Sequence, residues 1–128
     1  MYAVDRGDYN TIKLLLDNGA DVNMQNKYGR TALMYAVCRE DYNTVKLLLD
    51  NGADVNMKDN DGNTALMYAV DREDYNTVKL LLDNGADVNM KDNDGKTALM
   101  YAVGREDYNT VKLLLDNGAD VNMQNKYG

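Results

Sequence analysis

The hydrophobic residues of this chain recur with the spacing of short helices. In the stretch that opens with a threonine, Leu33, Ala36 and Val37 fall at i, i+3 and i+4. Residues with this spacing share one face of a helix. The pattern therefore predicts a helix over 32–37. Thr31 stands immediately before it and is a good N-cap, because its hydroxyl can accept a hydrogen bond from the first turn.

A second helix is predicted after a short polar break. Apolar residues at i, i+3, i+6 and i+7 share one face over 42–49, as in an amphipathic helix. Asp41 or Asn43 is expected to cap its start. Gly52 is expected to end it in a left-handed conformation. The polar, turn-rich segment beyond it predicts an extended finger with its turn at 60–62.

This whole pattern returns every 33 residues. Thr31, Thr64 and Thr97 each open the sequence TALMYAV, and GADVN occurs four times at the same spacing. A fixed period of this length is typical of solenoids and other arrays. The predicted fold is an all-α repeat solenoid that forms a single domain. Its units are a partial first repeat at 1–25, complete repeats at 26–58, 59–91 and 92–124, and a stub at 125–128.

Helices this short depend on their neighbours. Isolated helices below about 12–15 residues are marginal in water, so each unit is expected to be held by burial against the next one. The end units carry the same apolar residues as the middle ones, and we expect an exposed apolar face at each end. Either the tail of one molecule stacks on the head of another, or the chain is a fragment of a longer array.

Composition argues against several classes of function. The formal net charge is −7, which disfavours nucleic acid, because nucleic-acid binding relies on Lys and Arg at phosphates. It equally disfavours anionic membrane surfaces. The chain has no His and no Ser, and it shows no catalytic constellation, so we expect no enzyme and no cofactor. The absence of a signal-like N-terminus and of a second cysteine leads us to expect a cytoplasmic protein.

A metal site is also not expected. The segment that begins at Met57 is rich in Asp and Asn, as calcium loops are. An EF-hand loop needs Asp at its first position and Glu at its twelfth, where this chain has Met57 and Tyr68.

The motifs resemble the ankyrin repeat over the whole chain. The resemblance rests on Gly62-x-Thr64-Ala65-Leu66, on the Val-Lys-Leu-Leu-Leu run at 78–82, and on the Gly-Ala-Asp-Val-Asn run at 85–89. It implies a protein-binding module whose concave face is built from the fingers and the first helices. The chain departs from the family in having Ala65 and Met67 where Pro and His are usual, and Glu73-Asp74 where Gly-His is usual.

Because the copies are nearly identical, the positions that differ between them are informative. They fall in the finger, just after the finger glycine, at the end of the first helix and at the join between units. Positions free to vary are expected to face solvent or a partner. We therefore predict a protein partner contacted by Lys27, Tyr28, Arg30, Cys38, Asn60, Asp61, Asn63, Asp71, Asn93, Asp94, Lys96 and Gly104.

Tyr28 and Arg30 are the expected anchors, since Tyr and Arg dominate interface hot spots. The alternative is a structural or engineered array without a native partner, which self-associates end to end. The aligned arginines Arg39, Arg72 and Arg105 are expected to be neutralised by the acidic residues next to them. A less favoured possibility is that they bind an acidic partner segment.

Overall fold

The helices are arranged in pairs along an array. The computed structural model describes residues 8–123, and within this range it contains seven helices and no strand. The helices are α2 (Tyr9–Asp17), α3 (Ala32–Cys38), α4 (Tyr42–Asp50), α5 (Ala65–Asp71), α6 (Tyr75–Asp83), α7 (Ala98–Gly104) and α8 (Tyr108–Asp116). The all-α repeat solenoid predicted from the period of 33 is thereby confirmed.

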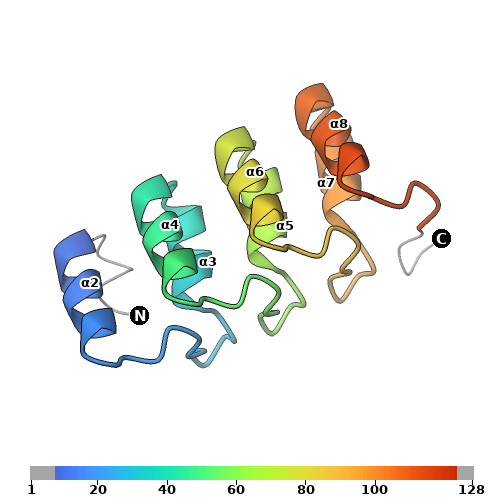
Figure 1. Ribbon diagram of the computed structural model, residues 1–128. Helices are drawn as coiled ribbons and strands as arrows, with labels where there is room; N and C mark the ends of the chain where they lie inside the picture. The colour runs from blue at the N-terminus through green and yellow to red at the C-terminus, as the bar shows by residue number, and fades with distance from the viewer. Residues whose placement is uncertain (1–7, 124–128) are drawn as a thin grey trace.

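Two layers of helices run along the array. Helices α2, α4, α6 and α8 lie side by side in one layer, and α3, α5 and α7 form the second layer behind it (Figure 1). The connecting fingers lie together along one side (Figure 1). We call the surface made by the fingers and by α3, α5 and α7 the finger face.

Both kinds of helix start at side-chain caps. Thr31 caps α3 by accepting the amide of Met34 at 3.3 Å. Asp41, rather than Asn43, caps α4: it accepts the amide of Thr44 at 3.1 Å and the hydroxyl of the same residue at 2.6 Å. These bonds satisfy amides that have no partner inside the helix. They recur in the following repeats.

The turn between paired helices has an unusual backbone. Glu40, Glu73 and Glu106 take positive φ angles of 58°, 58° and 56°, a left-handed conformation that side chains with a Cβ rarely adopt. These residues stand where the family resemblance leads one to expect Gly. The sequence analysis predicted only a polar break here, although the Gly expected from the resemblance is the residue that favours this conformation.

The core runs continuously through the layers. Leu33, Ala36 and Val37 are all buried, as their spacing predicts, and Val45 and Leu48 meet them from α4. The alanine repeats once per unit, and Ala36, Ala69 and Ala102 are completely buried. A small residue at this position allows α3, α5 and α7 to pack closely against one another.

The fingers bind one another through hydrogen bonds. Asn56 accepts the amide of Asp87 at 2.7 Å and donates its own amide to the carbonyl of Gly85 at 3.2 Å. Asn23 and Asn89 make the equivalent contacts with their own next repeats. Because these bonds have one geometry along the chain, they fix the register of each unit on its neighbour.

The finger tips approach one another closely at a glycine. Gly29 has a φ of 76°, and a Cβ added there would lie 2.6 Å from Oδ1 of Asn60. Only glycine therefore fits between this finger and the next. The turn predicted at 60–62 is present, closed by bonds of 2.9 Å between Asp59 and both Gly62 and Asn63.

Candidate functional site

A row of half-buried tyrosines runs along the finger face. Tyr35, Tyr68 and Tyr101 come from α3, α5 and α7. The hydroxyl of Tyr35 accepts the side-chain amide of Asn26 at 2.7 Å. In the next two repeats the tyrosine hydroxyl instead donates to a carboxylate at the base of the finger, Asp59 for Tyr68 and Asp92 for Tyr101.

The residue at the base of the finger also shapes the turn. Oδ1 of Asp59 accepts the amides of Asp61 and Asn63, both at 2.9 Å. Oδ1 of Asn26 accepts the amides of Tyr28 and Arg30, both at 3.0 Å. Asn26 and Asp59 therefore stabilise the turn through the same pair of hydrogen bonds in different repeats. The sequence interpretation missed this position, although its alternation between two residues of one shape was a readable signal.

Burial and the nearby carboxylate change the acidity of the tyrosines. Burial, reinforced by the hydrogen bond to Asp59, raises the pKa of Tyr68 to about 12. The same two causes, with Asp92 as the acceptor, raise the pKa of Tyr101. The hydrogen bond to Tyr35 raises the pKa of the Arg30 guanidinium. These tyrosines thus remain neutral hydrogen-bond donors at ordinary pH, and Arg30 remains a cation.

The two expected anchors lie together in the second unit. Tyr28 is 51% exposed. Nζ of Lys27 lies 5.2 Å from the centroid of its ring, and Cζ of Arg30 lies 5.4 Å from it. These distances are those of cation–π contacts. The finger therefore presents an exposed aromatic ring with two cations close to it.

The residues that follow the finger glycines lie beside the tyrosine row. Asn63 takes part in the hydrogen bonding around Tyr68, and Nζ of Lys96 lies 5.8 Å from the ring centroid of Tyr101. With Arg30 they form a second row of polar side chains. Cys38, Asp71 and Gly104 lie farther along, each at the last residue of a first helix.

Three of the positions that vary, Lys58, Asn60 and Asn93, are exposed, and each also binds a neighbouring repeat. The side-chain amide of Asn60 donates to the carbonyl of Lys27, and that of Asn93 donates to the carbonyl of Asn60, both at 2.9 Å. Lys58, at a join, donates to the carbonyl of Lys91 at 2.8 Å. Residues at these positions therefore contribute to contacts between repeats.

The expected pairing of the arginines also differs. Arg105 binds Asp71 of the preceding repeat at 3.0 Å, and not the acidic residues adjacent to it. The guanidinium of Arg105 crosses the boundary between two repeats to reach the carboxylate of Asp71 at the end of α5. In the preceding seam the residue equivalent to Asp71 is Cys38, so Arg72 lacks this contact.

Comparison with known proteins decides the family. The model described as ankyrin repeats in three copies matches residues 1–92 and 72–125. The chain belongs to the ankyrin repeat family. A protein of Acanthamoeba polyphaga mimivirus, R664, which is named as an ankyrin repeat protein, is 79% identical over 24 residues. That match spans 19% of this chain and 15% of the viral protein.

Ankyrin repeats are in general a non-enzymatic protein-interaction fold. In the part of the array from residue 8 to residue 123, no group of three or more acidic or cysteine side chains is placed to hold a metal ion. None of the helices described is long and apolar enough to cross a membrane.

A substitution at the base of the finger tests the tyrosine network. Asp59→Asn should preserve the turn, because Asn26 already makes the same contacts in another repeat. Removing the negative charge should lower the pKa of Tyr68 from about 12 toward the ordinary value of about 10. The measurement is ¹³C NMR of the tyrosine ring carbons against pH, with Tyr68→Phe used for assignment.

The same shift predicts a dependence of stability on pH. A folded-state pKa raised above the unfolded one favours the protonated tyrosine, so this stabilisation is complete below about pH 10 and is lost as pH rises toward 12. The Asp59→Asn variant should lose less stability across this window. An unchanged titration of Tyr68 in the variant would show that the carboxylate does not act on this hydroxyl.

Proposed function

We propose that this ankyrin array binds a partner protein through its finger face. The observation that carries the proposal is the cluster of Lys27, Tyr28 and Arg30. Its ring is half exposed and is contacted by two cations, those of Lys27 and Arg30. An ordered aromatic side chain can be buried by a partner with little loss of conformational freedom, and Tyr and Arg are the residues that most often dominate interface energies.

The remaining contact candidates extend this surface along the array. Asp61 and Asp94 are exposed at the next two finger tips, and Asn63 and Lys96 continue the row begun by Arg30. The finger face is thus basic and aromatic in its second unit and more acidic in the following ones. A partner of complementary charge would be bound in one direction along the array.

A pair of substitutions tests the proposal. Tyr28→Ala combined with Arg30→Ala should weaken partner binding by roughly 2 kcal/mol or more, as hot-spot truncations do. Lys46→Ala is the matched control, since Lys46 is an exposed cation on α4 in the opposite layer. The measurement is affinity capture from the source cell, followed by titration of the captured protein. Stronger loss from the control than from the pair would place binding on the α4 side.

A second candidate function is end-to-end association, and one comparison favours it. Val103 on α7 is 57% exposed, whereas its equivalent Val70 is fully buried. Val121 is 67% exposed, whereas Val88 is 7% exposed. Equivalent valines are therefore buried inside the array and exposed in its last described unit. A further unit of like sequence, in this chain or in a second copy, would bury them. Heterologous contacts of this kind need not close into a ring.

Charged residues at the open face test this association. Val103→Lys and Val121→Lys should lower the average mass seen by light scattering at high concentration, because both side chains lie at the exposed face and outside the buried core. Leu114 would be an unsuitable choice, since it is fully buried and a charge there would unfold the unit. A parent protein that stays monomeric at all concentrations would contradict the proposal.

A further inference from the structure

A groove recurs at each seam between the helices α2, α4, α6 and α8, whose layer we call the outer layer. Between α4 and α6 it has a volume of about 640 Å³ and is lined by Glu40, Tyr42, Arg72, Glu73, Asp74, Asn76, Lys79, Leu80 and Asp83. Between α6 and α8 the same positions, 33 residues later, line a groove of about 690 Å³. A smaller groove of about 450 Å³ lies between α2 and α4. We call these three the seam grooves.

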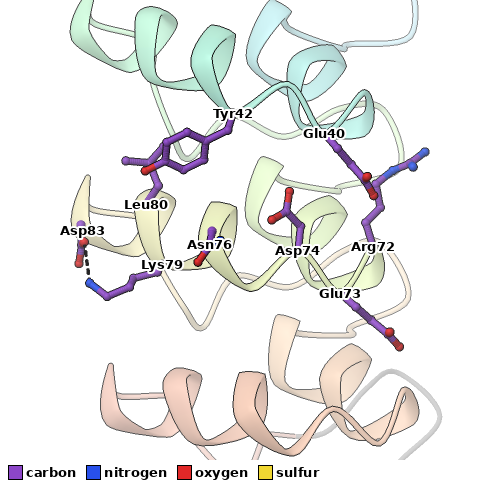
Figure 2. Close-up of a pocket in the computed structure, with 9 residues that line it drawn as sticks. All are labelled: Glu40, Tyr42, Arg72, Glu73, Asp74, Asn76, Lys79, Leu80 and Asp83. Atoms are coloured by element: carbon purple, nitrogen blue, oxygen red, sulfur yellow. Dashed lines mark hydrogen bonds and ion pairs between the residues drawn. The ribbon is translucent and has the colours of Figure 1, made fainter.

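Each groove combines an aromatic wall with carboxylates. Figure 2 shows the ring of Tyr42 lying over Leu80 at one end of the groove, with Glu40 and Asp74 toward the other end. Tyr42 is 42% exposed, so much of its ring faces solvent. An aromatic face next to carboxylates is a suitable site for a Lys or Arg side chain, which can contact both.

The carboxylates differ in how far they are already occupied. Asp83 binds Lys79 at 3.2 Å, and Asp74 accepts two bonds from Thr77 as a helix cap. The side chains of Glu40 and Glu73 make no hydrogen bond and no ion pair with any residue in the described range. These two carboxylates are the ones available to a ligand.

The backbone at these glutamates supports a role outside folding. Glu40, Glu73 and Glu106 have positive φ, a conformation that costs free energy for any residue except Gly. The first unit has Gly7 at this position in the sequence. Glu therefore recurs where Gly would adopt the backbone conformation more easily, although its side chain makes no hydrogen bond or ion pair among residues 8–123.

We propose that the seam grooves bind an extended, Lys- or Arg-bearing segment of a partner protein. The segment runs along the outer layer and places one cation in each of the two larger grooves. Packed helices lie about 8–10 Å apart, and an extended chain advances about 3.3 Å per residue. Successive cations in the segment are therefore spaced by about three residues.

The two larger grooves are expected to differ in their affinity for a cation. In the groove between α4 and α6, the guanidinium of Arg72 lies at the rim without an ion-pair partner among the residues described, and it offsets part of the negative charge. In the groove between α6 and α8, the equivalent Arg105 is held by Asp71. The groove between α6 and α8 is therefore expected to bind a cation more tightly than the groove between α4 and α6.

Synthetic peptides provide a direct test. One peptide carries Lys at every third residue between Gly and Ser, and a second has the same composition with its lysines contiguous. The protein should bind the spaced peptide more tightly, as measured by fluorescence anisotropy. Equal or tighter binding of the contiguous peptide would overturn the proposal, because it would show attraction to net charge without recognition of the grooves.

Variants of the glutamates separate binding from folding. The triple variant Glu40→Gly, Glu73→Gly and Glu106→Gly should weaken binding of the spaced peptide roughly tenfold, since exposed ion pairs each contribute only a few-fold. Its melting temperature should be unchanged or higher, because Gly relieves the left-handed backbone. The triple Glu→Gln variant should lose binding equally.

Further comparisons keep this surface distinct from the finger face. The Tyr28→Ala, Arg30→Ala pair should leave binding of the spaced peptide unchanged. A glutamate variant that binds the spaced peptide as well as the parent does would overturn the proposal. So would a fall in melting temperature in the Gly variant, which would show that these glutamates serve the fold.

Discussion

Burial between neighbouring repeats is the interaction on which the rest of this structure depends. The helices have seven or nine residues each, well below the about 12–15 at which an isolated helix becomes stable. Their buried residues form one cluster that extends from Ile12 to Leu114. Each helix pair therefore acquires its stability from the pairs on either side. This is why the same valine is buried in an inner repeat and open in the last one described.

Hydrogen bonds between fingers convert this stacking into a fixed register. Asn23, Asn56 and Asn89 each bind backbone groups of the next repeat. The finger glycines Gly29 and Gly62 leave no room for a side chain. The fixed register in turn aligns every surface position with its copies. Tyrosines form a row on the finger face, and the seam grooves recur on the outer layer. A repeat array thus offers a partner the same chemical group at regular intervals, and a few substitutions in one finger are enough to make one end of the face different.

Much of the architecture could be predicted from the sequence because it follows from local patterns. The period of 33, the capping by Thr31 and Asp41 and the left-handed Gly52 just beyond α4 all follow from residue type and spacing. The contacts that side chains make after folding could not be predicted in this way. That Asn60 binds the preceding finger depends on which residues meet across a seam between repeats. That Asp59 holds Tyr68 depends on how the finger lies against α5 within one repeat. The left-handed glutamates were also missed, although the Gly expected there from the family favours that conformation.

The dependence on stacking is tested most directly by one leucine position in two repeats. Leu81 and Leu15 are equivalent in sequence, but Leu81 is fully buried and Leu15 is 47% exposed. If neighbours supply the stability, Leu81→Ala should lower the free energy of unfolding by about 2–5 kcal/mol, as truncation of a buried Leu does. Leu15→Ala should lower it much less in the same denaturant titration. Equal losses at the two sites would contradict the account, because they would show that each unit is stable by itself.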